Sequence, residues 1–600
     1  MKPCGASERD HRSLTESDVA ALVPLVFATV VMIAAWLCDA AALRIHPASI
    51  FALGVLTLAV ASASILRPRG AWTASWSLRR LIAFLSLGGG FAAYVCWLAW
   101  PSLLPLTDGP DLVHHVSLIH FIQRRHALPN DPVFARYLGE MASYTPGSHL
   151  LAAIVAEWLR VDAVRVVHPV LALAVALKAG LIYNTLTRLL PGFPANFASS
   201  IAGTLLLLLP HRYLLEPLTV FGFYSQVVAE TFAVAALWAI FAWHQRPSRT
   251  LLALASLFLV GVVLSWPVYF PVPALAFVVV VALRWHDRRP VERTLADVLL
   301  ALGPAVVTIA TFAGRHPSSA GILRSGGSVL VPSVGVFGWP FVVLAAVGAV
   351  IALRRLRTTA PIVAFAAAAL AQIGALAVLQ SRLGATNLYL ANKTVFLLVS
   401  PAAIVAALAV DTTWRFAARL VGTLPAASFP RPASRKIAFF TAVGRDRATR
   451  LVTACSPLAV VALLLATDLP RQPLPPPLSE PIYHAGHWAQ ANVPSGCVDY
   501  LVERWITGYW LHLDVLGNAR ASERMRTETF EYKPTVGRWV VPDGAPFAIV
   551  ENLATLPADA RRNMTVLYQS GSAAVVRRSD GGGTCADEAP GIDRVGTASD

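Results

Sequence analysis

The sequence predicts a polytopic α-helical membrane protein with about thirteen transmembrane helices and a small C-terminal extracytoplasmic α/β domain. Two observations carry this prediction. Of the 600 residues, 56% are hydrophobic and only 14% are charged, which is far from the balance of a soluble protein. Apolar runs of about seventeen residues or more also recur along the chain, and each can cross about 30 Å of hydrocarbon as a helix.

The apolar runs define the candidate spans and their direction across the membrane. They cover residues 19–38, 49–66, 81–100, 163–187, 197–210, 225–243, 250–266, 267–284, 295–313, 329–353, 360–380, 394–411 and 451–468. Arginine and lysine accumulate in alternate loops, most densely in residues 412–450, and basic loops stay in the cytoplasm. This pattern predicts a plasma-membrane protein with a cytoplasmic N-terminus at residues 1–18. It also accounts for the net charge of +15 without a nucleic-acid partner, for which no basic patch interleaved with aromatic residues is visible.

The same topology places several loops and the C-terminal region on the extracytoplasmic side. The transmembrane domain covers residues 19–468 and contains one large outer loop, residues 101–162. A proline-rich linker at 469–480 leads to an α/β domain at 481–578, where short strand-like runs alternate with turn signals, and residues 579–600 are expected to be disordered. Cys497 and Cys585 both lie beyond the linker, and the sequence leaves open whether they form a disulfide.

The large outer loop concentrates titratable residues more than any other stretch of the membrane half. Asp108 and Asp111 open what reads as a helix through about Arg125, with Pro110 suited to its first turn. Asp111, His114 and His115 fall at i, i+3 and i+4 and therefore share one helical face. One Asp is a candidate general base, the two histidines are candidate substrate contacts, and a capped helix start is the structural alternative. A metal site made of these three residues alone is the weaker hypothesis.

Three other residues of the loop are candidate substrate contacts. Glu140 adds a further acid, and Tyr144 and His149 flank a Thr-Pro-Gly-Ser turn that leads into an apolar helix. The turn has a structural explanation, because Pro-Gly reverses the chain and Ser148 can cap the helix. Such a turn would also direct Tyr144 and His149 back toward the first acids.

Charged residues near the outer ends of later spans complete the candidate set. Arg382, Tyr389 and Lys393 precede or begin the 394–411 span, where basic residues run against the positive-inside bias. They can either snorkel to lipid phosphates or bind a lipid-linked phosphate. Glu230 lies inside a span, where an acid is costly and is by default a functional hypothesis, the alternative being a Glu that is hydrogen-bonded within the bundle.

These features together resemble the GT-C superfamily of membrane glycosyltransferases that use polyprenyl-phosphate sugars. The resemblance rests on a large first outer loop with paired acids, an amphipathic His-containing helix, the Tyr-Thr-Pro-Gly-Ser-His turn, a late outward Lys and an outer C-terminal domain. It covers roughly residues 80–410 and is architectural. Protein mannosyltransferases, aminoarabinose transferases and actinobacterial arabinofuranosyltransferases belong to this superfamily, and the Ala/Arg/Val/Pro-rich composition suits a high-GC actinobacterium.

The resemblance implies transfer of a sugar from a polyprenyl-phosphate donor to a glycan, lipid or protein acceptor of the cell envelope. Asp108 or Asp111 would be the catalytic base, and Lys393 or Arg382 would bind the donor phosphate. Such a donor is already activated, so no nucleotide site is needed, and a divalent cation (Mg²⁺ or Mn²⁺) is compatible but not required. Two alternatives are a polytopic transporter or lipid flippase and a non-catalytic envelope assembly protein.

Overall fold

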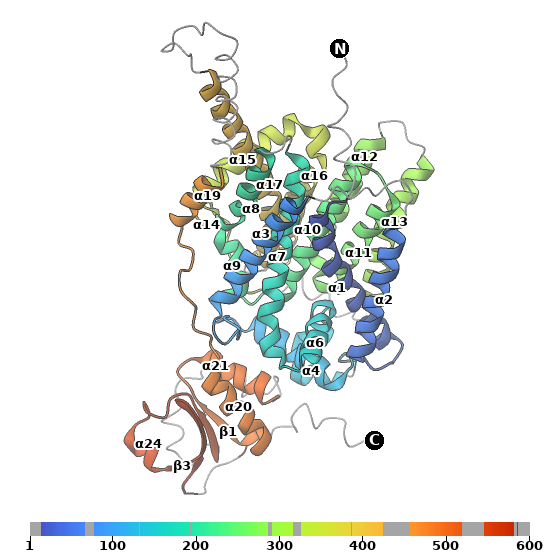
Figure 1. The fold of residues 1–600 in the computed structure, drawn as a ribbon. Helices are drawn as coiled ribbons and strands as arrows, with labels where there is room; N and C mark the ends of the chain where they lie inside the picture. The colour runs from blue at the N-terminus through green and yellow to red at the C-terminus, as the bar shows by residue number, and fades with distance from the viewer. Residues whose placement is uncertain are drawn as a thin grey trace, which may run out of the picture.

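The computed structural model describes residues 14–66, 77–130, 132–190, 195–285, 291–315, 326–385, 387–423, 456–518, 545–580 and 585. Its membrane half is a helix bundle, and a small mixed sheet with two flanking helices lies at one end (Figure 1). Within the described residues, eight helices are long and apolar enough to cross a membrane, and five shorter apolar helices accompany them. The chain is therefore a polytopic α-helical membrane protein with a small C-terminal sheet.

Each predicted span overlaps one of the described helices, although several of these helices are shorter than the predicted span. These helices are α1 (Glu16–Ala40), α2 (Pro47–Leu66), α3 (Leu78–Leu98), α7 (Ala163–Leu189), α8 (Ala195–Leu205), α10 (Tyr224–Gln245), α11 (Arg249–Ser265), α12 (Pro271–Trp285), α13 (Val291–Arg315), α15 (Trp339–Arg354), α16 (Leu356–Arg382), α17 (Tyr389–Thr423) and α19 (Ser456–Leu465). The 329–353 span begins later than predicted, because Gly338 has φ +82° and Pro340 occupies the first turn of α15. The predicted break at Trp266-Pro267 separates α11 from α12.

The large loop between α3 and α7 is itself helical. It contains α4 (Asp111–Arg125), α5 (Ala135–Leu138) and α6 (Gly147–Leu159), with short 3₁₀ turns at Pro132–Phe134 and Gly139–Ser143. The predicted helix through Arg125 is thus present, and it ends where His126 adopts a left-handed conformation. Outside this loop, short α9 (His211–Thr219) precedes α10, and α14 (Val334–Phe337) precedes α15.

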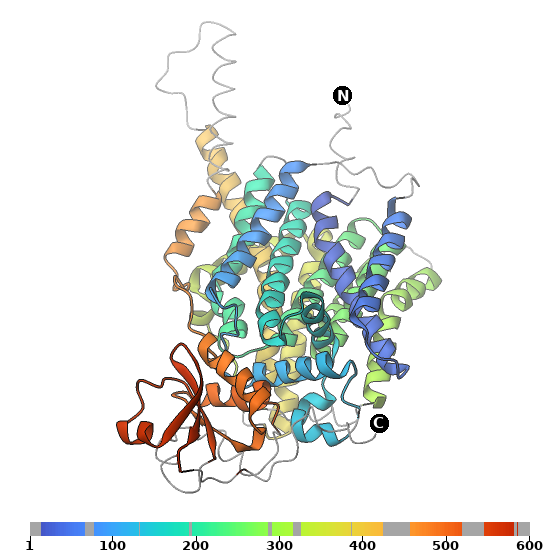
Figure 2. The same ribbon diagram turned by 60° about the horizontal axis from the view of Figure 1, so that its bottom comes forward.

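Four inter-span loops meet at one end of the bundle, which we call the loop end. The Thr107 hydroxyl donates to the Leu218 carbonyl at 2.9 Å, and the Asn387 amide donates to the Gly327 carbonyl at 2.9 Å. Figure 1 shows α4 and α6 at this end, and Figure 2 brings the loop end forward. These are the loops at 101–162, 211–224, 314–328 and 381–393, and their described parts lie together.

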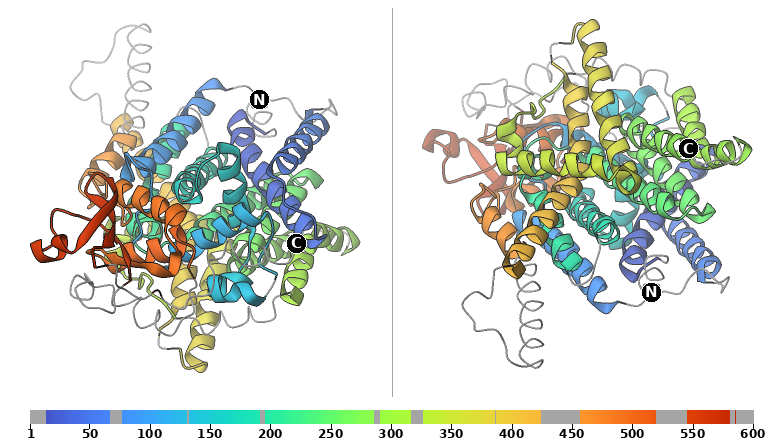
Figure 3. Two further views of the ribbon diagram at one scale, coloured as in Figure 1. Left: turned by 90° about the horizontal axis from the view of Figure 1, so that it is seen from below. Right: turned by 90° about the horizontal axis from the view of Figure 1, so that it is seen from above.

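The C-terminal region docks on the loop end. Its elements are α20 (Glu480–Asn492), β1 (Val498–Leu501), α21 (Trp505–Tyr509), a π-helix η7 (Trp510–Val515), β2 (Phe547–Val550), α24 (Ala558–Arg562), β3 (Met564–Ser570) and β4 (Ala573–Arg578). The sheet has the order β1-β2-β4-β3, with β1 parallel to β2 and the other pairs antiparallel. Four strand-like runs of the sequence, at 497–502, 547–550, 565–568 and 573–577, overlap the four strands, and a fifth run, at 538–541, lies outside the described residues. Seen from below, α20 and α21 lie beside α4 (Figure 3).

Candidate functional site

The turn that carries the two acids is held by the segment between α9 and α10. Gly222 has φ +72°, and a Cβ there would lie 2.6 Å from the Cβ of Leu112. Gly109 also lies close to Val220: a Cβ added at Gly109 would be 3.0 Å from the carbonyl oxygen of Val220. The approach of the two backbones needs glycine at both positions. It fixes the start of α4 and with it the direction of Asp111.

Lys393 lies in a cage of aromatic rings beside this turn. Its Nζ is 3.7 Å from the ring centre of Phe223, 4.3 Å from that of Tyr389 and 5.3 Å from that of Trp266. The side chain is buried, and among the described residues no carboxylate oxygen lies within 4.0 Å of Nζ. The ring faces stabilise the cation electrostatically in place of a counter-ion. We call Phe223, Trp266 and Tyr389 the lysine cage.

The lysine cage connects directly to Asp111. The Tyr389 hydroxyl donates to Oδ2 of Asp111 at 3.4 Å, and the negative charge of Asp111 acts on Lys393. Asp111 remains partly exposed, whereas Lys393 is buried. The structure therefore brings together three of the residues singled out from the sequence: Asp111, Tyr389 and Lys393.

Three further predicted residues, Tyr144, His115 and His149, form a chain of contacts that begins at Trp266 of the lysine cage. Tyr144 stacks on Trp266 with ring centres 5.5 Å apart and contacts His115 edge-to-face at 5.2 Å. Nδ1 of His115 lies 2.8 Å from Nε2 of His149. Burial holds the pKa of His115 well below its usual range, so the ring is neutral and this contact is an ordinary imidazole hydrogen bond.

Three predicted residues have other partners. Asp108 is exposed and forms an ion pair with Arg504 of the C-terminal region. Glu230 is buried in the bundle and accepts a hydrogen bond from Lys178 at 3.0 Å, which matches the hydrogen-bonded alternative. Arg382 ends α16 as an exposed residue.

His114 and Glu140 belong to the contact with the C-terminal region. Nε2 of His114 lies 2.5 Å from the Tyr509 hydroxyl oxygen, and its Nδ1 lies 3.2 Å from a carboxylate oxygen of Glu140. Both ring nitrogens are thus engaged. His114 connects α4 to α21 and to the 3₁₀ turn at Gly139–Ser143.

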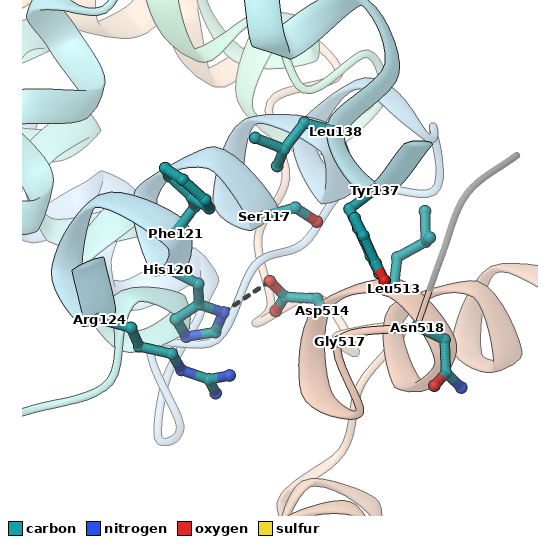
Figure 4. Close-up of a pocket in the computed structure, with 10 residues that line it drawn as sticks. All are labelled: Ser117, His120, Phe121, Arg124, Tyr137, Leu138, Leu513, Asp514, Gly517 and Asn518. Atoms are coloured by element: carbon teal, nitrogen blue, oxygen red, sulfur yellow. Dashed lines mark hydrogen bonds and ion pairs between the residues drawn. The ribbon is translucent and has the colours of Figure 1, made fainter. Parts of the chain in front are cut away.

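A buried charge cluster lies farther along α4, at a small pocket between α4 and η7 (Figure 4). The two nitrogens of His120 lie 2.8 Å from carboxylate oxygens of Asp162 and Asp514. Burial alone would lower the pKa of His120, but the two carboxylates outweigh burial and raise it to about 10. Burial raises the pKa of Asp514, whereas His120 holds that of Asp162 well below its usual range.

Sequence reasoning missed Phe223, Trp266, Tyr509 and the His120 cluster. Phe223 lies in a Phe-Gly-Phe-Tyr run, and Trp266 precedes the proline that breaks a helix. Both are aromatic residues beside a backbone irregularity at the outer end of a span, and this pattern could have identified them as site residues. Tyr509 and Asp514 gave no such signal. Among the described residues, no group of three His, Cys, Asp or Glu side chains has an arrangement that could hold a metal ion.

The comparisons with known proteins found similar solved structures but no matching family. No protein-family model matches the sequence, and no curated protein matches it. The archaeal oligosaccharyltransferase AglB from Archaeoglobus fulgidus, in complex with an inhibitory peptide and a dolichol-phosphate, is 12% identical with a TM-score of 0.46, over 79% of this chain and 70% of that chain. The apo oligosaccharyltransferase of the same organism is 14% identical with a TM-score of 0.43, over 76% of this chain and 64% of that chain. Likeness at this level assigns no activity to the chain.

Proposed function

We propose that the chain is a membrane glycosyltransferase of the GT-C type, which transfers a sugar from a polyprenyl-phosphate donor to an acceptor of the cell envelope. The observation that carries the proposal is the pairing of Asp111 with Lys393 across Tyr389. Asp111 is a partly exposed carboxylate, and Lys393 is a buried cation with no carboxylate within 4.0 Å among the described residues. Sugar transfer from an anionic lipid carrier needs such a base and such a cation at the end of a membrane bundle.

The reaction follows from the charges of these two groups. The acceptor hydroxyl attacks the anomeric carbon, and the carboxylate of Asp111 takes the hydroxyl proton. The bond between the anomeric carbon and the phosphate oxygen breaks, and its electron pair stays with the polyprenyl phosphate. Lys393 stabilises the negative charge that develops on this leaving phosphate, in a site where ring faces replace water. Direct displacement inverts the anomeric centre.

The proposal assigns the loop end to the extracytoplasmic side of the plasma membrane, with residues 469–480 as the linker and 481–578 as the outer domain. The disulfide between Cys497 and Cys585 supports this assignment, because disulfides persist in oxidising compartments. The basic loop at 412–450 would then be cytoplasmic.

One observation favours the transporter alternative. The ion pair between Lys178 and Glu230 is fully buried between two membrane-crossing helices, α7 and α10. Ionisable residues in such positions often mark ion or proton pathways in transporters. The pair is satisfied within itself, however, while the cation of Lys393 has no carboxylate within 4.0 Å of it among the described residues, so we place the activity at Lys393.

The test is a transfer assay that compares the two acids. Native membranes, which supply the acceptor, receive synthetic farnesyl-phosphate donors of mannose, arabinofuranose or aminoarabinose, each with a radiolabel in the farnesyl group. The measured quantity is released farnesyl phosphate. We expect Asp111→Asn to lower the rate by about 10²–10⁴-fold, as for loss of a general base. Asp108→Asn is the matched control, because Asp108 pairs with Arg504 at the surface. Full activity of the Asp111 variant would refute the assignment.

A further inference from the structure

Trp266 combines two features that the proposed reaction does not use. It is 3% exposed, and its indole Nε1 has no hydrogen-bond partner among the residues that the structure describes. A buried N–H group without an acceptor costs free energy, and such groups are rare unless a ligand or water satisfies them. The indole belongs to the lysine cage, and its ring centre lies 5.3 Å from Nζ of Lys393.

A second buried tryptophan shows why the missing partner alone is not sufficient. Trp238 in α10 is also fully buried with an unpartnered Nε1, and Arg188 lies over its ring at 5.5 Å. That arginine already forms an ion pair with Asp18, so its charge is neutralised. The cation beside Trp266 has no carboxylate within 4.0 Å among the described residues. Within the described part of the chain, Trp266 differs from Trp238 because its unpartnered donor lies next to a cation that has no carboxylate within 4.0 Å.

We infer that the indole N–H of Trp266 is a second phosphate ligand, which acts with the ammonium group of Lys393 on one phosphate of a lipid carrier. The inference rests on the proposed function and adds to it. A cation and a neutral N–H donor in neighbouring side chains suit a phosphate better than they suit a neutral sugar, because both groups only donate. The stacking of Tyr144 on Trp266 fixes the plane of the indole and thereby the direction of its N–H.

The experiment uses Trp266→Phe, which keeps one aromatic ring in the cage and removes the N–H together with the five-membered ring of the indole; Trp238→Phe removes the same atoms elsewhere in the bundle. The full-length protein in detergent is titrated with farnesyl phosphate by calorimetry. A hydrogen bond to a charged group predicts about tenfold weaker binding by this variant than by the wild type. Trp238→Phe is the matched control and should bind as the wild type does. Farnesol and inorganic phosphate, titrated separately, distinguish the lipid tail from the phosphate as the source of affinity.

The possible binding results test the role of Trp266 and the lipid-phosphate donor separately. Weaker binding of farnesyl phosphate by Trp266→Phe, with farnesol binding unchanged, supports the inference. Equal affinity of Trp266→Phe and the wild type would overturn the role of Trp266 while the proposed function stands. If the wild type itself did not bind farnesyl phosphate, both the inference and the lipid-phosphate donor would be wrong. Thermal unfolding of both variants checks that each is folded.

Discussion

The hydroxyl oxygen of Tyr509 lies 2.5 Å from Nε2 of His114, although the two residues are separated by 395 positions in the sequence. Three contacts join two segments of the chain, and this contact is the middle one. One segment is α4 with the turn that precedes it, and the other includes α21 and η7. The outer two are the ion pairs of Arg504 with Asp108 and of Asp514 with His120. The C-terminal residues are five positions apart: Arg504 precedes α21, Tyr509 ends α21, and Asp514 lies in η7. The C-terminal region thus holds the helix that carries Asp111.

The first prediction concerns Tyr509→Phe. The change leaves Nε2 of His114 buried without a partner, which costs about 1–3 kcal/mol. We expect a lower midpoint of thermal unfolding in detergent. Tyr568→Phe in β3 is the control, because Tyr568 is partly exposed and stacks on Trp488, and it should change stability by less than about 0.5 kcal/mol. Equal midpoints for the two variants would mean that the contact does not stabilise docking.

The second prediction is a pH dependence that arises from His120. Its pKa is raised from an unfolded value of about 6.5 to about 10 in the folded protein. A raised pKa contributes stability that is complete below the unfolded value and is lost as pH rises through the folded value. The groups around it are Asp162, Asp514, His487 and Arg124. We therefore expect the unfolding midpoint to fall between about pH 6.5 and pH 10.

His120→Gln tests this origin. The variant leaves two carboxylates buried without a cation, so it should be less stable by about 3–5 kcal/mol near neutral pH and should lose the alkaline slope. His484→Gln is the control, because His484 is exposed and pairs with Glu480 at the surface. A slope that persists in His120→Gln would assign the pH dependence to another group.

The third prediction concerns the close approach at Gly222. Gly222→Ala places a methyl group against Leu112 at a positive φ, so it should displace the start of α4 and lower both stability and transfer activity. We expect a loss of about 1–3 kcal/mol. Gly303→Ala in α13, where a Cβ meets no atom within 4 Å, should be neutral or slightly stabilising. Unfolding and transfer assays on both variants check this. If Gly222→Ala changed neither stability nor activity, the segment between α9 and α10 would be able to shift without cost.

The fourth prediction separates the two cations at the ends of α16 and α17. Lys393→Met should lower release of farnesyl phosphate by about 10²–10³-fold, as for loss of one transition-state donor. The variant should be as stable as the wild type or more stable, because it removes a buried charge that has no carboxylate within 4.0 Å in the described part of the chain. Arg382→Met changes an exposed residue and should keep most of the activity. If Arg382→Met lost more activity than Lys393→Met, the phosphate would have to be assigned to Arg382.

Much of the fold could be predicted from the sequence, because apolar length alone determines where helices cross a membrane. The start of α4 was predictable for a similar local reason, since Pro110 suits a first turn. Which acid faces the cation was not predictable, because Asp108 and Asp111 share one turn and only the contact with Tyr389 distinguishes them. The partner of Glu230 depended on how α7 and α10 are rotated against each other, which apolar runs do not encode.

The most direct test is a cryo-electron microscopy structure of the full chain carrying Asp111→Asn, with a farnesyl-phosphate sugar bound. The account predicts phosphate oxygens within about 3.2 Å of Nζ of Lys393 and the anomeric carbon on the side of the phosphate that faces residue 111. A phosphate bound at Arg382, or between α7 and α10 beside Lys178, would contradict it.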